Sequence, residues 1–399
     1  MALTAMAGPK FRERIQAIDI LRGVVIVLMV LDHVRTFLHA SEYAYDPLDP
    51  AQTTALVYVT RWITHLCAPT FVFLSGVSIW IQLARGKSRG ELSSFLLSRG
   101  GWLILVEITV VSFALAFQIP YLLFLQVIWA IGWSMVAMAA LVWLPRWVVL
   151  AIGIAIIAGH DTLDAIKPAQ WGAYAELWMV LHSGGAIVRN GAPFALVIYP
   201  LIPWLGVMAL GFGVGQVFLT APPQRDRALF TLGAVMVLTF FILRSSHAYG
   251  DPHVWSVQAD FRSTAMLFFN VQKYPPSLLY VCITLGPVFL LTPLVERWRG
   301  ATAQFFRTLG AVPMFAYVVH LYLVHTSAIL LHLAWHQDSS VQFNFVKKIF
   351  LTPQVAAGTG LPLLLVYVTW LSVLAVLYPL CRWYAQFKKQ RTDWWLSYI

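Results

Sequence analysis

The sequence predicts an all-α protein that crosses a membrane about ten times, and two observations carry this prediction. Of its 399 residues, 59% are hydrophobic and only 11% are charged, whereas ordinary soluble domains are about a quarter charged. The mean hydropathy is +0.73, and apolar stretches long enough to span a bilayer recur along the chain. We therefore expect a polytopic membrane protein with ten or eleven transmembrane helices.

Lysine and arginine residues are distributed as in a membrane protein and not as in a nucleic-acid-binding protein. The net charge is +10, but the basic residues recur in short clusters between apolar stretches and form no single patch. With the N-terminus inside, 17 of the 27 Lys and Arg residues fall in inner segments and seven in outer loops. Inner loops are the ones enriched in these residues. We therefore expect both termini in the cytoplasm and no nucleic-acid partner.

The chain divides into a basic N-terminal segment, one integral-membrane domain and a C-terminal tail. We expect these parts at residues 1–14, 15–385 and 386–399, with both end segments cytoplasmic. Ten spans are expected, at about 15–39, 69–84, 92–117, 122–144, 147–160, 197–219, 228–244, 277–296, 310–335 and 360–383. Long loops should follow the fifth and seventh spans. Three widely separated cysteines imply no disulfide framework.

The first span carries an ionisable cluster near each end, which sets it apart from the others. Charged groups at membrane depth are costly, so they normally face a protein interior or a wet cavity and are functional candidates. Helical spacing places Arg22 and His33 on one stripe, with Asp19 beside it. Asp32 and Arg35 lie three residues apart and can form an ion pair. We expect Asp19 and Arg22 to form a structural salt bridge, with anion binding by Arg22 as the alternative.

The second span is preceded by a short helix and is expected to be broken near Pro69. Proline removes a backbone donor from a helix. Here it frees backbone groups near His65, which favours a polar cavity over lipid. Arg61 lies one turn before His65 on the same face. His33 and His65 should thus lie at a similar depth, either as reactive groups or as packing groups that form hydrogen bonds between helices.

The third span holds Glu107 in its middle, and a carboxylate at that depth needs a partner. Arg61 or Arg22 on another helix is the expected partner.

On the ninth span, His320 and His325 are five residues apart and share no stripe. The sequence contains neither CxxC nor HExxH, so we expect no metal site. It also contains no Walker A, GxSxG or Rossmann motif.

Several of these stretches resemble the bacterial branch of the heparan-α-glucosaminide N-acetyltransferase family. The resemblance runs through nearly the whole chain and rests on IDILRGVVIVLMVLDHVR, TRWITHLCAPTFVFLSG, YPLIPWLGVMALGFGVG, NVQKYPPSLLYV and PMFAYVVHLYLVH. It implies a transmembrane, acyltransferase-like domain in a bacterial inner membrane, which takes an acetyl group from cytosolic acetyl-CoA and delivers it to an amino sugar across the membrane. His39, with Ala40 and Ser41, matches the family's His-Ala-Ser. His65 stands where the family has the Asp of a D-L-x-F-P motif, and His33 stands where the lysosomal enzyme has Asn.

We therefore interpret the chain as an acyltransferase that moves an acetyl group from cytosolic acetyl-CoA to an external glycan or envelope amine or hydroxyl. A histidine suits the role of general base because it titrates near neutral pH. The candidates are His33 first, then His65, then His39, with Asp32 adjacent to the first. The candidate residues for binding the CoA phosphates at the cytoplasmic mouth are Arg22, Arg85, Lys87, Arg89 and Arg99.

Two functions from other classes remain open at this point. Broken helices and buried charges fit a secondary transporter for an anionic or sugar solute equally well. A non-catalytic membrane subunit is the second alternative. Consumption of acetyl-CoA distinguishes an acyltransferase from both. Besides lipid, acetyl-CoA and the acceptor, a second copy of this chain is a partner that the sequence leaves open.

Overall fold

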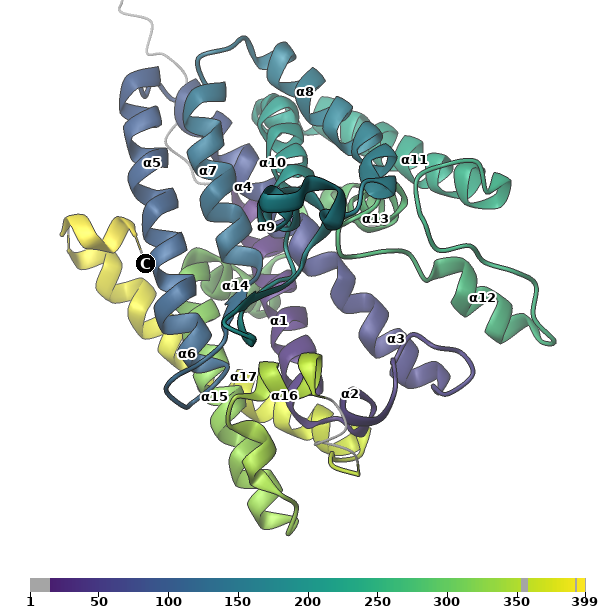
Figure 1. Cartoon of the computed structure of the whole chain (residues 1–399). Helices are drawn as coiled ribbons and strands as arrows, with labels where there is room; N and C mark the ends of the chain where they lie inside the picture. The colour runs from purple at the N-terminus through teal and green to yellow at the C-terminus, as the bar shows by residue number, and fades with distance from the viewer. Residues whose placement is uncertain (1–14, 353–357, 392, 399) are drawn as a thin grey trace, which may run out of the picture.

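The computed structural model describes residues 15–352, 358–391 and 393–398, so the predicted N-terminal segment 1–14 lies outside the described residues. Each predicted span contains a helix (Figure 1). These helices are α1 (Gln16–Leu38), α3 and α4 (Ala55–Ile63, Cys67–Ala84), α5 and α6 (Arg89–Val106, Ser112–Ala114), α7 (Val127–Leu141), α8 (Arg146–Gly159), α10 (Leu201–Val214), α11 (Pro222–Ser246), α13 (Leu278–Glu296), α15 (Pro313–Ala334) and α17 (Leu363–Gln390). The predicted all-α membrane fold is therefore confirmed.

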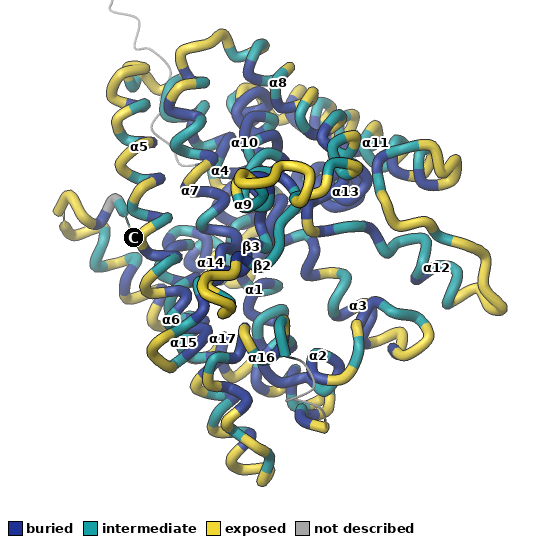
Figure 2. The backbone as a smooth tube through the Cα atoms, in the orientation of Figure 1, coloured by how far each residue is buried: buried dark blue, intermediate teal, exposed yellow. Residues whose placement is uncertain are grey.

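The helices differ in how much of their apolar surface the protein itself covers. Eight helical segments of the described chain are long and apolar enough to cross a membrane. The helices of the other two predicted spans do not meet both conditions. Helix α1 is long enough, with 23 residues, but carries several charges, and α7 is apolar but has only 15 residues. In their most apolar windows, 22% of the residues of α8 and α11 are buried, against 67% in α10 and α13. The protein thus leaves more of α8 and α11 exposed than of α10 and α13, as the colours of Figure 2 show. Exposed apolar surface of this kind is typical of helices that face lipid.

Helix α1 lies in the middle of the bundle (Figure 1). It packs against α4, α13, α15 and α17, and against the short helix α14 (Gly300–Ala311). A Cβ atom at Gly310 of α14 would overlap the backbone carbonyl of Asp19, and one at Gly23 would overlap the backbone of Phe306. Glycine at these two positions therefore lets the backbones of α1 and α14 approach closely.

The predicted helix break lies just before Pro69. Helix α3 ends at Ile63, a 3₁₀ turn covers Thr64–Leu66, and α4 starts at Cys67. Pro69 occupies the first turn of α4, where a missing backbone donor costs least. The break is thus confirmed, and it falls a few residues earlier than the proline.

Several segments differ from the sequence prediction. The predicted fourth span starts at 122, but Leu123–Leu125 forms strand β1 and α7 starts at Val127. Strand β1 pairs in parallel with β3 (Ala192–Val197), which pairs antiparallel with β2 (Gly185–Arg189). The last long helix continues to Gln390, past the predicted boundary at 385. The remaining short helices are α2 (Ala40–Ala44), α9 (Ala175–Trp178), α12 (Phe261–Phe269) and α16 (Phe345–Leu351).

Candidate active site

Charged residues gather around the C-terminal end of α1, and we call them the Asp32 cluster. The cluster comprises Asp32, Arg35, Glu42, Arg61 and Lys273. Oδ1 of Asp32 accepts hydrogen bonds from Nη1 of Arg61 at 3.1 Å and from Nη2 of Arg35 at 3.4 Å. Nη1 of Arg35 also donates to Oε2 of Glu42 at 2.6 Å. The predicted ion pair between Asp32 and Arg35 is confirmed, and it is part of a larger network.

The break between α3 and α4 supplies two of the groups that bind Asp32. Arg61 lies in the last turn of α3, and Thr64 opens the 3₁₀ turn that follows. Oγ1 of Thr64 donates to Oδ1 of Asp32 at 2.9 Å, and Nη1 of Arg61 donates to Oγ1 of Thr64 at 3.1 Å. The irregular backbone therefore places a hydroxyl and a cation on one carboxylate oxygen, as expected where a helix break faces protein instead of lipid.

Lys273 reaches the cluster from the segment before α13. Lys273 is 8% exposed, and its positive charge interacts electrostatically with Asp32 and His33. The ammonium also lies 5.1 Å from the centroid of the Tyr274 ring. Three cations and two carboxylates make the cluster net positive. Sequence reasoning missed Lys273 because the residue lies far along the chain in a predicted loop, and only its place in the NVQKYPPS stretch marks it.

His33 lies beside this cluster and forms a hydrogen bond with a second histidine. Nδ1 of His33 is 2.7 Å from Nε2 of His320 on α15. His320 is completely buried, whereas His33 is partly exposed although it lies deep in the bundle. Sequence reasoning considered His320 only as a metal ligand and missed this pairing. Helix-face spacing within one span cannot predict it, because the two residues lie on different helices.

His65 lies near the cluster but is closed off from solvent. The residue is 1% exposed, and neither ring nitrogen has a hydrogen-bond partner in the described part of the chain. Its ring packs 5.5 Å from that of Tyr280, whose hydroxyl donates to the His65 carbonyl at 2.9 Å. This surrounding suits a packing role better than proton transfer with an incoming acceptor.

His39 lies apart from His33 and caps a short helix. Its Nδ1 accepts the backbone N–H of Ser41 at 3.1 Å and lies 2.7 Å from the Ser41 hydroxyl. The residue is 5% exposed, so His39 is buried although it lies beside a polar loop. The His-Ala-Ser sequence here forms the start of α2, where a side-chain acceptor satisfies a free backbone donor.

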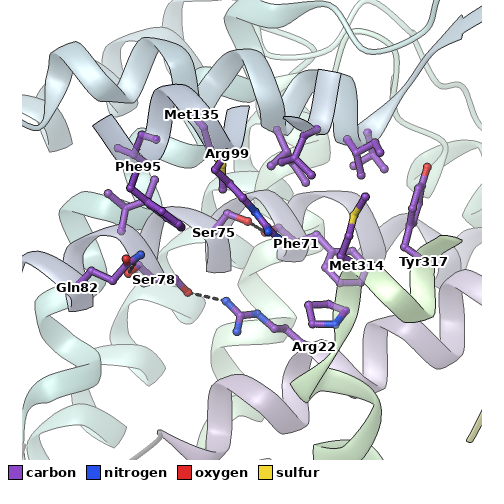
Figure 3. Close-up of a pocket in the computed structure, with 17 residues that line it drawn as sticks. Arg22, Phe71, Ser75, Ser78, Gln82, Phe95, Arg99, Met135, Met314 and Tyr317 are labelled. Atoms are coloured by element: carbon purple, nitrogen blue, oxygen red, sulfur yellow. Dashed lines mark hydrogen bonds between the residues drawn. The ribbon is translucent and has the colours of Figure 1, made fainter. Parts of the chain in front are cut away.

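A cavity of about 260 Å³ lies beside the N-terminal half of α1 (Figure 3), and we call it the Arg22 cavity. It is lined by Arg22, Phe71, Ser75, Ser78, Ile79, Gln82, Phe95, Leu96, Arg99, Leu103, Val127, Ile128, Ile131, Met135, Pro313, Met314 and Tyr317. Nη2 of Arg22 donates to Oγ of Ser78 at 2.5 Å, and Nη1 lies 3.7 Å from Oδ1 of Asp19. The predicted contact between Asp19 and Arg22 is confirmed. An apolar wall with a few charged and polar groups is typical of a small-molecule site.

Of the other residues predicted to bind the CoA phosphates, one lines this cavity, one contacts its lining and two lie outside it. Arg99 lines it, as Arg22 does. Nζ of Lys87 donates to Oε1 of Gln82 at 3.2 Å and lies 4.0 Å from the centroid of the Phe95 ring, and both partners line the cavity. Two further cations, Arg85 and Arg89, are exposed and are not part of the lining.

Tyr317 connects the Arg22 cavity to the histidine pair. It lines the cavity, and it precedes His320 on α15 by three residues, which is about 4.5 Å along a helix axis. The two ring centroids are 5.7 Å apart. The cavity therefore extends to within one helical turn of His320, which in turn binds His33.

Glu107 has a different partner from the one predicted. Its Oε2 accepts the backbone N–H of Trp129 at 3.0 Å, in the first turn of α7. A helix N-terminus carries partial positive charge and free donors, so it stabilises a carboxylate without a cation. The prediction of Arg61 or Arg22 as the partner is wrong: these residues bind Asp32 and Ser78.

A smaller polar cavity of about 200 Å³ has Tyr274 in its lining, and we call it the Tyr274 cavity. It is lined by Asp164, Ile166, Lys167, His182, Ser183, Pro252, Gln272, Tyr274 and Pro275. Tyr274 directly follows Lys273 of the cluster. Burial lowers the pKa of His182, so this ring is neutral at neutral pH. Together with the charged groups of Asp164 and Lys167, these donors and acceptors suit a ligand with several hydroxyl or amide groups.

Comparison with known families places the chain beside a family of membrane enzymes. The model described as heparan-alpha-glucosaminide N-acetyltransferase, catalytic, matches residues 14–248 of the chain. This range covers more than half of the chain and includes Arg22, His33 and Arg99, but it stops before His320. No curated protein matches the chain.

Proposed function

Because the chain belongs to the heparan-alpha-glucosaminide N-acetyltransferase family, we propose that it transfers an acetyl group from acetyl-CoA to an amine or hydroxyl of a glycan or another envelope molecule. Family membership supports a transmembrane acetyltransferase in general. The specific proposal is that the donor binds in the Arg22 cavity and that the acceptor reaches His33 from the side of the Asp32 cluster. The two substrates would then meet inside the bundle.

One observation carries this proposal. Tyr317 lines the Arg22 cavity, and His320, three residues further along α15, forms a hydrogen bond with His33 at 2.7 Å. The inner end of the donor cavity is thus about one helical turn from His320, whose ring forms a hydrogen bond with the proposed base. A transfer reaction needs this proximity, because the nucleophile and the thioester carbonyl must come within contact distance.

The lining of the Arg22 cavity fits the parts of acetyl-CoA. Arg22 and Arg99 can bind phosphate oxygens, and guanidinium groups match their geometry. Lys87 lies at the rim, held by Gln82. The apolar lining toward Tyr317 suits the long pantetheine arm, which would direct the thioester toward His33.

His33 is the proposed general base. Its Nε2 would accept the proton of the acceptor amine or hydroxyl as the nitrogen or oxygen attacks the thioester carbonyl carbon. The carbon–sulfur bond then breaks, CoA leaves as the thiolate, and the proton on His33 can neutralise it. Asp32 would orient Arg61 and Arg35, whose positive charges would stabilise the negative charge that develops on the thioester carbonyl oxygen during the attack.

On the acceptor side, the Tyr274 cavity is lined by Tyr274, which directly follows Lys273 of the Asp32 cluster. Its acid, amide, hydroxyl and imidazole groups support an acceptor with several polar groups, such as a sugar residue. Hydrogen bonds of this kind hold a polar ligand in one orientation. Such contacts would place one amine or hydroxyl next to His33.

The proposed direction of transfer requires the Arg22 cavity to face the cytoplasm, where acetyl-CoA is found. Reporter domains fused after Pro47 and after Lys87 should then read opposite sides of the membrane, with Lys87 inside, because Lys and Arg are enriched on the inner side. Enzymatic reporters that work in only one compartment make the measurement. Identical readings from both fusions would contradict the orientation.

Removing a cavity cation should weaken donor binding. We expect Arg99→Gln to lower the affinity for acetyl-CoA by about ten-fold or more, because a hydrogen bond to a charged group contributes roughly 1.5–3 kcal/mol. Isothermal titration calorimetry of the purified protein measures it. The matched control is Arg227→Gln, since Arg227 is exposed on α11, outside this cavity. Equal affinities of both variants would remove the cavity as donor site.

The transporter remains the second candidate because the helix break beside the Asp32 cluster is a common feature of transporter binding sites. Membranes supplied with radiolabelled acetyl-CoA distinguish the two. An acyltransferase releases CoA and labels an acceptor. A transporter moves solute and leaves acetyl-CoA intact, and a non-catalytic subunit does neither.

A further inference from the structure

The hydrogen bonds of His320 determine which nitrogen of His33 is free. Nδ1 of His320 lies 2.9 Å from the backbone carbonyl oxygen of Ala316, and Nε2 lies 2.7 Å from Nδ1 of His33. A carbonyl oxygen only accepts, so Nδ1 of His320 must carry the hydrogen. In the neutral ring, Nε2 of His320 then has a lone pair and can only accept.

The same reasoning fixes the tautomer of His33. If Nε2 of His320 accepts, Nδ1 of His33 must donate, and it therefore carries the hydrogen of the neutral ring. Nε2 of His33 is left with its lone pair. This is the atom that can accept a proton from an incoming nucleophile.

The surroundings of His33 leave this atom accessible. His33 is partly exposed, and within the described residues its side chain forms a hydrogen bond through Nδ1 and not through Nε2. The neighbouring Asp32 accepts its hydrogen bonds from Arg61, Thr64 and Arg35. The charged groups that act on His33 are Asp32, Lys273, Arg35 and Arg61.

We propose that His320 is a positioning residue that holds His33 in the tautomer protonated at Nδ1, so that Nε2 is the base. The inference rests on the proposed function in that His33 takes the proton. When Nε2 of His33 becomes protonated, Nδ1 keeps its hydrogen and still donates to His320. A neutral imidazole thus has the orienting role that a carboxylate has in other histidine-containing sites.

The arrangement also explains why His320 itself is not the base. Both of its ring nitrogens already have partners, and the residue is 0% exposed. An acceptor could reach it only by displacing His33. The two histidines therefore have different roles, which the hydrogen bond to Ala316 distinguishes.

Two substitutions of His320 test the proposal. In His320→Gln the amide oxygen can accept from Nδ1 of His33, whereas His320→Leu fills the space without an acceptor. We expect His320→Leu to lower kcat by about 10- to 100-fold, the range typical when the hydrogen-bond partner that orients a metal-bound histidine is removed. The KM for acetyl-CoA should stay the same, and the pH–rate profile should shift. His320→Gln should keep most of the activity and the wild-type profile.

The tautomer is measured directly by ¹⁵N NMR of histidine-labelled protein in lipid nanodiscs, with His33→Asn to assign the signal. The proposal predicts a protonated Nδ1 and an unprotonated Nε2 for His33 in the wild type, and a mixture of tautomers in His320→Leu. Wild-type His33 protonated at Nε2 would overturn the proposal, and so would equal kcat values for the Gln and Leu variants. Absence of acetyl transfer by the wild type would instead overturn the proposed function, while the NMR result still decides the tautomer.

Discussion

His33→Ala should retain acetyl-CoA binding and lose acetyl transfer by about 100-fold or more, because removal of a general base typically costs 10²- to 10⁴-fold in rate. The donor site should be intact, since His33 is not among the residues that line the Arg22 cavity. Donor affinity is measured by calorimetry and transfer by release of CoA thiol. The expected pattern is a reduced kcat with an unchanged dissociation constant for acetyl-CoA.

The other two histidines provide the controls for this variant. Any loss of activity in His65→Ala and His39→Ala should match their loss of stability. Among the described residues the buried His65 ring has no hydrogen-bond partner, and the His39 ring caps α2. The loss of a helix cap costs about 1 kcal/mol. If His33→Ala is active and one of the other two variants is inactive despite a normal melting temperature, the assignment of the base to His33 is wrong.

Asp32→Ala should destabilise the protein by about 3–5 kcal/mol, the cost of leaving buried charges without their partner. Arg35 and Arg61 have side chains that are 2% and 15% exposed, and both donate to Oδ1 of Asp32. Thr64 also loses its acceptor. Chemical denaturation in detergent micelles measures the change in the free energy of unfolding.

The matched control is an ion pair on the surface of the protein. Glu176 pairs with Arg189, and both side chains are more than a third exposed, so Glu176→Ala should leave the unfolding midpoint unchanged. An Asp32→Ala variant with normal stability and no activity would show that Asp32 acts in the reaction itself and does not hold the cluster together.

The membrane fold was predictable because long apolar stretches can be read directly from the sequence, and stretches of this length form helices in a membrane. Each of the ten apolar stretches contains a helix, and the break beside Pro69 follows from the geometry of proline. The three-stranded sheet was not predictable, since β1 and β3 are short and pair over a long separation in sequence. The same holds for α14, which packs on α1 within a segment assigned to a loop.

In the candidate site, contacts within one helix could be predicted and contacts between helices could not. Asp32 and Arg35 are three residues apart, so helical geometry alone brings them together. The contacts of Asp32 with Arg61 and of His33 with His320 depend on how separate helices pack. Glu107 shows the opposite error, because a search for a cation overlooked the N-terminus of α7 as a partner.

Transfer of labelled acetyl groups in sealed membrane vesicles tests the central claim most directly. Inverted vesicles that contain the full chain receive radiolabelled acetyl-CoA on the outside, which corresponds to the cytoplasmic face. The account predicts loss of acetyl-CoA, release of CoA, and label on glycan or other envelope acceptors recovered from the vesicle interior. Vesicles that carry His33→Ala receive the same labelled acetyl-CoA as a control, and their acceptors should stay unlabelled. Intact acetyl-CoA and unlabelled acceptors in wild-type vesicles that also contain acceptor would contradict it.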